Sequence, residues 1–498
     1  MSDPQSPANG GAKPKNLSRR GFMAGAATGG AVAIAGAYAI NDLPLGEGSG
    51  FKARGFSRAR PIVTNTGPLP ARVDAVVIGG GFLGVSTALS LAQRGLSVAL
   101  LEKGVVAGEA SGRSAGMVES ILNGRSQLDL IEYSKQRWRR MNQIIGEETG
   151  FMQHGNTVLY TDGALLGAAK DWLDGVRDLP HAGARMLSAA EAAAIAPGAK
   201  VKLAGGIHAP EDGSAEPTLA APAIALGAMK LGARIHQNCA VRGIETSGGR
   251  VSGVVTEKGI IKTSHVVLAG GVWSPVLARG LGLDLPMVQG WVSMASVLPF
   301  ENAPPPGNVS LIGPNVGWRR QFDGGYAVWQ YAAIGPVLPD GVSHLRAFLP
   351  LLKANWSLVG IRFSFDTFVR WMNYGHEVPL DRPGVFETMR VYEPDLRLDV
   401  IDKGITRLRD TVPAFANAAV DERWTGAMSM TPDTKPVLSE VRGVPGLVMA
   451  TGFYHGLTVG PGAGEIAADL VTGKTPAINI SAFRYERLID GSKLDIYS

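Results

Sequence analysis

The stretch "ARVDAVVIGGGFLGVSTALSLAQRGLSVALLEKG", residues 71–104, decides the fold. Residues 73–78 form a short apolar run, which is typical of a buried parallel strand. Residues 85–93 have the apolar spacing of a helix, and residues 97–101 form a second apolar run. The order of these signals predicts a strand, a tight turn, a helix and a second strand in a doubly wound α/β sheet.

Three glycines and one acid give this unit a function. Gly79 allows a tight turn after the first strand, Gly81 lets a pyrophosphate approach the backbone, and Gly84 lets the helix pack closely on the strand. The start of the helix offers free N–H groups and the positive end of its dipole to phosphates. Glu102 ends the second strand, where a carboxylate can accept hydrogen bonds from ribose hydroxyls. The pattern predicts a dinucleotide site, and Glu102 suits either NAD or FAD.

Two later stretches favour FAD over NAD. Residues 109–117, "EASGRSAGM", follow the second strand and are rich in small side chains that let the backbone reach a flavin or its phosphates. Residues 263–274, "TSHVVLAGGVWS", read as another apolar strand that runs into a double glycine. This double glycine is a second place where backbone can meet a dinucleotide.

Several motifs resemble the D-amino-acid-oxidase-like superfamily of FAD oxidoreductases. They are "EKG" at 102–104, "ASGR" at 110–113, "AGGVWS" at 269–274, and the C-terminal stretches "ERWTGAMSMTPDTKPVLSEV" and "GLVMATGFYHGLTVGPGAGEIAADLVTGK". Within this superfamily the sequence is most similar to the membrane-bound L-amino acid deaminases of Proteus type. The resemblance implies an FAD enzyme that oxidises amino acids to keto acids and ammonia and passes electrons to the respiratory chain.

The glycine motif and the resemblance together give a set of candidate cofactor-binding residues. These are Gly79, Gly81, Phe82, Gly84, Glu102, Lys103, Ala110, Ser111, Arg113, Val241, Ala269, Gly270, Trp273, Gly452, Tyr454, Gly456, Leu457 and Thr458. For Arg113, a structural ion pair is the alternative to contact with the flavin phosphates. The resemblance also implies that the loop from Gly452 to Thr458 packs against the flavin ring.

The substrate pocket departs from the family pattern. The position of the deaminases' carboxylate-binding Arg falls on Tyr331, that of a Gln falls on Met117, and that of a pocket Trp falls on His455. We take His455 and Tyr331 as the candidate catalytic residues, with a hydrogen-bonded wall residue and a strand aromatic as the alternatives. Glu119 reads as a surface residue, with pairing to a substrate ammonium as the alternative. The resemblance thus supports the cofactor and the reaction type and leaves the substrate open.

The expected fold class is mixed α/β. A Rossmann-like FAD-binding domain is interleaved with a substrate domain on an antiparallel sheet, after an N-terminal hydrophobic segment. The expected FAD-binding parts are 71–120, 220–280 and 420–498; the substrate domain takes 121–219 and 281–419, with 343–375 as a possible membrane-facing insertion. Residues 1–42 read as a twin-arginine signal or anchor and 43–70 as a linker.

The leader holds Arg19 and Arg20 directly before an Ala- and Gly-rich apolar core that ends near Ala39. We expect export by the twin-arginine route, with the chain anchored in the inner membrane and facing the periplasm, or periplasmic if the leader is cut. The basic and aromatic segment 343–375 is too interrupted by charge to span a bilayer. It reads either as a surface-binding segment or as packed helices.

Composition excludes several other classes. The 498 residues carry a formal charge of +5 that is spread along the chain, so we expect no nucleic-acid surface. The single cysteine, Cys239, excludes an internal disulfide and reads as a packed side chain, and the eight histidines form no metal cluster. The expected function is FAD-dependent oxidation of an amino acid or related amine. The alternatives are an oxygen-using oxidase of a secondary amine and a flavin-bearing binding or electron-transfer subunit with a degenerate pocket.

Overall fold

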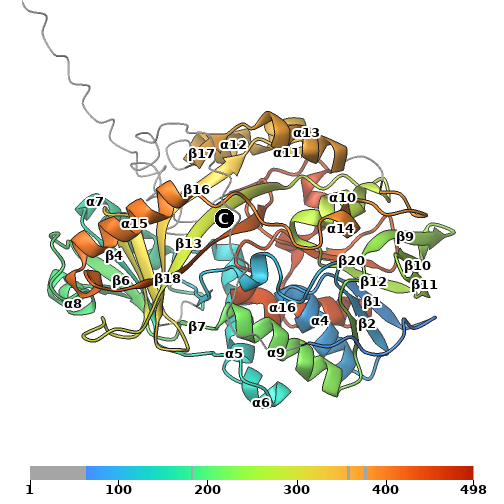
Figure 1. Cartoon of the computed structure of the whole chain (residues 1–498), viewed down its shortest axis with the longest axis horizontal. Coiled ribbons are helices and arrows are strands. Elements are labelled where there is room, and N and C mark those ends of the chain that lie inside the picture. The colour runs from blue at the N-terminus through green and yellow to red at the C-terminus, as the bar shows by residue number, and fades with distance from the viewer. Residues whose placement is uncertain (1–62, 181–182, 356–358, 375–377, 497–498) are drawn as a thin grey trace, which may run out of the picture.

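The computed structural model describes residues 63–180, 183–355, 359–374 and 378–496, which form two main sheets (Figure 1). The predicted leader, residues 1–42, and most of the linker 43–70 lie outside the described residues. In the described part of the chain, no helix combines the length and the apolar character that crossing a bilayer requires.

The smaller sheet has six strands, all parallel except for one edge strand. Their order is β19 (Val437–Glu440), β20 (Leu447–Thr451), β12 (His265–Leu268), β1 (Ala75–Ile78), β2 (Val98–Leu101) and β8 (Arg234–His236). The predicted strand–turn–helix–strand unit is therefore confirmed. The helix α4 (Phe82–Gln93) begins three residues earlier than its apolar spacing indicated, because the glycine turn leads directly into its first turn.

Helix α4 packs against both α9 (Pro217–Lys230) and α16 (Gly456–Val471) beside this sheet (Figure 1). Small residues permit the contact of α16 with its neighbours. A Cβ on Gly464 would lie 2.5 Å from the Cβ of Ser86 on α4, and a Cβ on Gly462 would lie 2.9 Å from the Cα of Ser134. Ser134 belongs to α5 (Leu128–Trp138), so α16 is held between two helices. A small three-stranded sheet, β9 (Val241–Ser247), β10 (Arg250–Thr256) and β11 (Gly259–Lys262), shares a second buried cluster with the other face of the parallel sheet.

The larger sheet is mainly antiparallel, as expected for the substrate domain. Its strands in order are β18 (Val420–Met430), β13 (Val288–Val297), β16 (Tyr326–Pro336), β15 (Val316–Arg320), β14 (Asn308–Ile312), β4 (Asn156–Tyr160), β6 (Gly205–Ala209) and β5 (Arg185–Leu187), and β17 (Val359–Arg362) pairs with β16. The helix α15 (Leu398–Thr411) packs against it with a core of buried aromatic and aliphatic side chains.

The domain boundaries differ from those expected at two places. β18 was placed in the FAD-binding domain, but it pairs with β13 along the edge of the larger sheet. α5 and α6 (Met141–Ile145) were placed in the substrate domain, but they pack against α16 and α9. In both cases the element is placed by contacts with residues far away in the sequence. The local sequence pattern of the element does not indicate these contacts.

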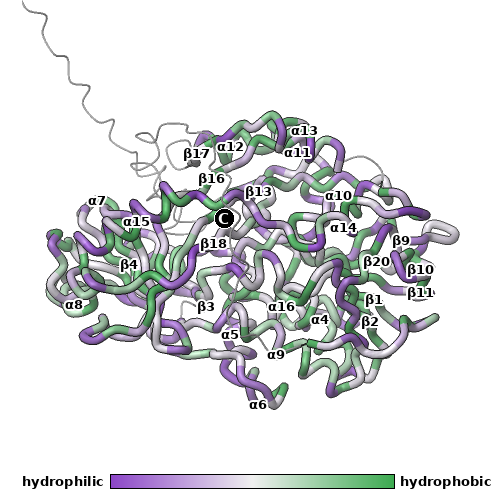
Figure 2. The backbone as a smooth tube through the Cα atoms, viewed as in Figure 1, coloured by the Kyte–Doolittle hydropathy of each residue, from purple (hydrophilic) through white to green (hydrophobic). Residues whose placement is uncertain are grey.

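A separate layer covers the outer end of β16 and β13, at the top of Figure 1. It consists of α11 (Pro339–Ser343), α12 (Leu345–Asn355), β17 and α13 (Phe365–Tyr374). Hydrophobic and hydrophilic residues are mixed along it in Figure 2, and several large apolar side chains are exposed. We call residues 339–355 and 359–374 the cap.

Short elements make up the rest. They are β3 (Met117–Val118), β7 (Gly213–Ser214), α7 (Gly163–Gly175), α8 (Ala189–Ile195), α10 (Ser274–Arg279), α14 (Val385–Thr388), and the 3-10 turns at Ala110–Gly112, Arg125–Gln127, Gly271–Trp273, Pro413–Phe415, Ser481–Phe483 and Tyr485–Leu488. β3 pairs with β7 beside the start of β4, where the two main sheets meet.

Candidate active site

A long cavity brings the predicted site residues together. It is lined by the turn after β1, the end of β2, most of residues 105–119, the turn after β12, the middle of β13 and β16, residues 426–429 of β18, and residues 450–458. Every candidate cofactor-binding or catalytic residue lines it, with the exception of Gly84. Gly84 lies behind the turn, where a Cβ would be 1.8 Å from the Gly79 carbonyl oxygen. This placement fits the close helix–strand packing predicted for it.

The turn after β1 leaves no room for side chains. Gly79 has a φ of 109°, and a Cβ there would lie 2.4 Å from the Ala269 carbonyl oxygen. A Cβ on Gly81 would lie 2.8 Å from the Ser111 Oγ. The backbone of α4's first turn is thereby exposed to the cavity, as an approach by a phosphate requires.

Glu102 and Ser111 both bind backbone at this turn. The Glu102 carboxylate accepts hydrogen bonds from the Gly80 N–H at 2.7 Å and from the Gly104 N–H at 2.8 Å. Burial raises the pKa of the Glu102 carboxyl, and these two backbone donors oppose the shift. The Ser111 Oγ accepts a hydrogen bond from the Phe82 N–H at 3.0 Å, which attaches residues 110–112 to the start of α4.

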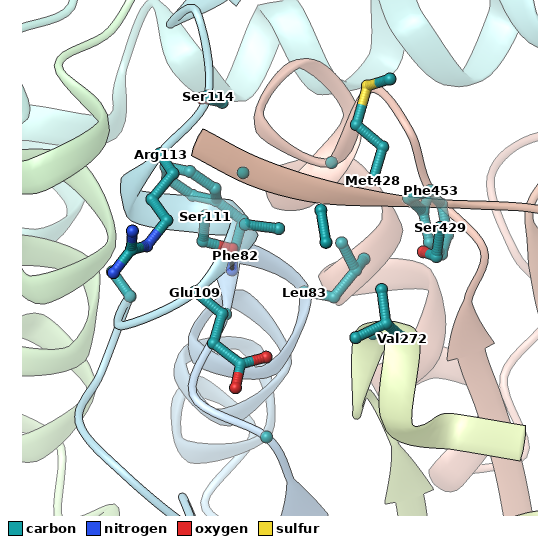
Figure 3. A pocket seen from close by; sticks show the side chains of 18 of the residues that line it. Phe82, Leu83, Glu109, Ser111, Arg113, Ser114, Val272, Met428, Ser429 and Phe453 are labelled. Carbon is teal, nitrogen blue, oxygen red and sulfur yellow. Dashed lines mark hydrogen bonds between the residues drawn. The ribbon is translucent and has the colours of Figure 1, made fainter. Parts of the chain in front are cut away.

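The cations near this end are held in ion pairs. The Lys103 Nζ lies 2.5 Å from a Glu109 carboxylate oxygen, and Glu109 also accepts from the Trp273 indole N–H at 3.0 Å. The Arg113 Nη2 lies 2.6 Å from Glu393, so the structure places Arg113 in the ion pair that was the alternative interpretation. Figure 3 shows Glu109, Ser111 and Arg113 following one another beside Phe82 and Leu83 at the start of α4.

An aromatic cluster closes the same end against the cap. Trp273 stacks on Trp371 of α13 with ring centroids 5.1 Å apart, and Phe386 and Tyr392 form T-shaped contacts with Trp273. Phe386, Arg390 and Tyr392 line the cavity. Sequence reasoning did not predict these residues, since nothing in the pattern of residues 385–392 marks a cofactor contact.

The other end of the cavity is built around Glu119. Its side chain is only 14% exposed and lies 3.2 Å from the Nδ1 of His455, so the interpretation of Glu119 as a surface residue is wrong. The Asn156 amide donates a hydrogen bond to the second Glu119 oxygen at 3.2 Å. The Thr458 hydroxyl donates to the Met117 carbonyl at 3.0 Å, which attaches β3 to the first turn of α16. His455 precedes that turn directly.

Two phenols flank this pair. Tyr331 is 1% exposed, and its hydroxyl contacts the Ser310 hydroxyl. The ring of Tyr454 lies 3.6 Å from that of His455 between centroids. Burial raises the pKa of both phenols, and the nearby Glu119 carboxylate adds to the shift. Tyr331 and Tyr454 therefore offer hydrogen bonds and no charge.

Sequence reasoning missed several residues at this end. Asn156, Gln330, Met294 and Met428 come from four different strands, and the last three line the cavity. Met294 and Trp329 are register partners in β13 and β16. Only the pairing of these strands, which the sequence does not reveal, places them on one wall. Cys239 is buried, as predicted.

The donors and the free space of this cavity fit FAD. Gly79 and Gly81 supply the backbone turn for a pyrophosphate, Glu102 the ribose acceptor, and the turn after β12 a second backbone contact. The loop from Gly452 to Thr458 borders the cavity next to Glu119, where the reactive ring is expected.

Comparison with known proteins agrees with this fit. The family model described as DAO, FAD dependent oxidoreductase, matches residues 74–470. The structure of an L-amino acid deaminase from Proteus myxofaciens, in complex with anthranilate, is 36% identical, covers 86% of this chain and 97% of that chain, and has a TM-score of 0.82. The L-amino acid deaminase from Proteus vulgaris is 35% identical with 86% and 99% covered and a TM-score of 0.80.

Curated relatives are more distant in sequence. Human mitochondrial sarcosine dehydrogenase is 26% identical over 89% of this chain, and the match spans only 44% of that relative's length. Glycine oxidase from Bacillus licheniformis is 25% identical over 84% of this chain and 98% of its own length. The match to residues 74–470 covers most of the chain, so this protein belongs to the DAO family of FAD-dependent oxidoreductases, and FAD is the cofactor of its cavity.

Proposed function

We propose that this chain oxidises the carbon–nitrogen bond of an amino acid or a related amine and passes the electrons to a respiratory acceptor. The observation that carries the proposal is the shared cavity, in which the dinucleotide-binding turn and the Glu119–His455 pair line one space. The names of the relatives support the reaction class, since they include deaminases, dehydrogenases and oxidases of amino acids and amines.

The two ends of the cavity have different functions in this reaction. FAD, when bound, accepts a hydride equivalent from the carbon that bears the nitrogen. Glu119 and His455, 3.2 Å apart, can hold the proton that an ammonium must lose before its carbon is oxidised. Trp329, Met117 and Met294 give this end an apolar wall that limits water around the reacting carbon.

The direct test is anaerobic reduction of the bound flavin. Purified holoprotein is mixed without oxygen with a panel of amino acids and amines, and the flavin absorbance near 450 nm is followed. We expect at least one member to bleach the flavin, and an artificial quinone to restore the absorbance. A flavin that no amino acid or amine bleaches would refute the proposal.

The same assay separates the two alternatives. An oxygen-using oxidase would release hydrogen peroxide at the rate of substrate loss in air, whereas the proposed dehydrogenase releases little and needs the quinone. A binding or electron-transfer subunit with a degenerate pocket would show no turnover with any artificial acceptor.

We also propose that the cap docks on a membrane surface, where a lipid-soluble acceptor is found. Phe363 and Phe365 are 61% and 70% exposed, and Leu349 is 49% exposed on the neighbouring helix. Arg346 and Arg370 are exposed on the same segment. Exposed aromatic and aliphatic side chains with nearby basic residues suit the interface of an anionic bilayer.

Vesicle sedimentation tests this surface with a matched control. The double variant Phe363→Ser/Phe365→Ser of the full chain should sediment several-fold less with phosphatidylglycerol-containing vesicles than the wild type. Phe322, which is 51% exposed in the turn between β15 and β16, provides the control, and Phe322→Ser should sediment like the wild type. Equal sedimentation of all three proteins would contradict the docking surface.

The leader is the remaining part of the proposal. We propose export through the twin-arginine route, with residues 22–40 as an anchor or a removable signal. Changing Arg19 and Arg20 to lysine should leave flavin-loaded protein in the cytoplasm, as measured by cell fractionation and flavin absorbance. Unchanged export of this variant would exclude the route.

A further inference from the structure

The charges along the cavity are unevenly distributed. The charged or titratable residues that line it, phenols aside, are Glu102, Lys103, Glu109, Arg113, Glu119, Arg390 and His455. Arg390 donates to the Lys103 carbonyl just after β2, and Arg113 donates to the Thr425 carbonyl of β18. Each of the three strong cations has an acidic partner. Lys103 pairs with Glu109, Arg113 pairs with Glu393, and the Arg390 Nη2 lies 2.6 Å from Glu257.

The end around Glu119 has the opposite character. Of the described cavity-lining residues contributed by β13, β16, β18 and residues 450–458, none is Arg or Lys. The side chains there are Val292, Met294, Trp329, Gln330, Tyr331, Met428, Ser429 and the loop residues up to Thr458. Glu119 is therefore the fixed carboxylate of this end, and the imidazole of His455 is its neighbour.

The remaining polar groups at this end do not provide a positive charge that would stabilise a second anion. The Tyr331 hydroxyl is already in contact with the Ser310 hydroxyl, and the Asn156 amide donates to Glu119 itself. The Nδ1 of His455 faces Glu119, so a proton on that nitrogen is shared with this carboxylate. The His455 Nε2 is buried and has no hydrogen-bond partner among the described residues. The indole N–H of Trp329, which lines the same end, is likewise buried without a partner in the described part of the chain. These two groups are neutral donors, and neither is the fixed cation that a second buried carboxylate would need beside Glu119.

We propose that the substrate enters this end as a cation without a carboxylate on the carbon that bears its nitrogen, and that Glu119 binds its ammonium group. This inference rests on the proposed function and names the substrate class for it: a primary or secondary amine. A carboxylate on that carbon would lie within a few ångströms of Glu119 in a buried space and would lack a cation partner. The ammonium proton passes to the Glu119 carboxylate, with His455 Nδ1 beside it, and leaves the neutral amine that the oxidation needs.

A pair of unreactive probes tests binding without turnover. 2-Phenylpropan-2-amine and 2-amino-2-phenylpropanoate differ only in that a methyl group of the amine is a carboxylate in the acid. Neither has a hydrogen on the carbon that bears the nitrogen, so neither can be oxidised there. Their affinities for the holoprotein are measured by calorimetry and by the shift of the flavin absorbance. We expect the amine to bind at least tenfold more tightly.

Variants locate the effect. Glu119→Gln should weaken binding of the amine at least tenfold and change binding of the acid less than threefold. Glu211→Gln is the matched control, because Glu211 is 49% exposed and pairs with Arg139 outside the cavity. Flavin content of each variant is measured first. Should Glu119→Gln lose the flavin, the probe pair on the wild-type protein still decides the substrate class.

Reactive pairs separate this inference from the proposed function. Benzylamine is compared with phenylglycine, and 3-methylbutylamine with leucine, in anaerobic flavin reduction. We expect the amines to bleach the flavin faster. Bleaching by the amino acids alone, or tighter binding of the acid probe, overturns the inference and leaves the proposed function intact. Bleaching by neither class refutes the proposed function, and the unreactive probes then test the binding inference independently.

Discussion

The two ends of the cavity are built on different principles. At the dinucleotide-binding end, backbone contacts backbone, and added Cβ atoms on Gly79 and Gly84 would lie 2.4 Å and 1.8 Å from carbonyl oxygens. At the other end, side chains from separate strands surround Glu119, and the contacts are between polar groups at about 3 Å, such as the 3.2 Å between Glu119 and His455. The first end is fixed by sterics and suits a cofactor that never changes. The second can be altered residue by residue, which is how one fold serves many substrates.

The largest effect is expected from a substitution that disrupts the dinucleotide-binding end. Gly84→Val should abolish flavin binding, because its side chain would overlap the Gly79 carbonyl that shapes the turn. We expect less than about a tenth of the wild-type flavin per chain. We also expect a loss of soluble protein, because the backbone of the turn cannot move aside without displacing β1. The ratio of flavin to protein absorbance measures this.

A helix glycine without close neighbours is the control for that variant. A Cβ on Gly167 of α7 would meet nothing within 4 Å. Gly167→Ala should keep the flavin and leave stability equal or up to about 1 kcal/mol higher, since alanine favours helix. Equal flavin loss in both variants would mean that the turn is not sterically fixed.

The next largest effect is expected from Asp212, which holds the segment around Glu119 in place at the second end. Asp212 is fully buried and accepts hydrogen bonds from Ser120, the neighbour of Glu119, and from the Lys135 Nζ at 2.7 Å. Among the described residues, Asp212→Ala would leave the buried Lys135 with the more distant Glu132 carboxylate, at 3.5 Å, as its remaining acidic partner. We expect a loss of about 3–5 kcal/mol in unfolding free energy, measured by denaturant titration.

An exposed pair provides the comparison for Asp212. Asp178 pairs with Arg125, and their side chains are 66% and 48% exposed. Asp178→Ala should leave the denaturation midpoint unchanged, because solvent screens such a pair. A similar loss in the two variants would contradict the special position of Asp212.

The smallest effect concerns pH and again lies beside the second end. Burial lowers the pKa of His154 to about 4, against the hydrogen bond between its Nε2 and the Asn308 amide oxygen, which favours the charged form because the oxygen can only accept. The unfolded chain, with an ordinary pKa of 6.5, binds the proton at higher pH than the folded chain does. Stability is therefore lost as pH falls from about 6.5 towards 4, by at most about 3 kcal/mol.

Replacing the imidazole should flatten this dependence. The unfolding free energy of His154→Gln should vary less between pH 7 and pH 4.5 than that of the wild type. The pKa values of His208 and His236 are also lowered by burial, so part of the slope remains. A variant with an unchanged slope would show that His154 does not titrate in this window.

The contrast between the two ends of the cavity also explains which parts of the site could be predicted from the sequence. The turn from Gly79 to Gly84 and Glu102 are fixed by short-range geometry, so the spacing alone predicted their positions in the strand–turn–helix–strand unit. The pairing of Glu119 with His455 joins segments far apart in the sequence, and single-residue statistics favoured a surface Glu. The membership of β18 in the larger sheet and the packing of α5 on α16 depend on long-range contacts in the same way.

The strand order of the parallel sheet has a consequence for the timing of folding. β1 is made early, but the sheet also needs β20, which ends at Thr451, and the cavity needs the start of α16, which follows it. The ribosome must therefore translate past Thr451 before the flavin site can close, and β1 is made long before these partners. A secretion route that threads the chain during synthesis would carry β1 away before its partners exist. The proposed export of an already folded holoprotein avoids that separation.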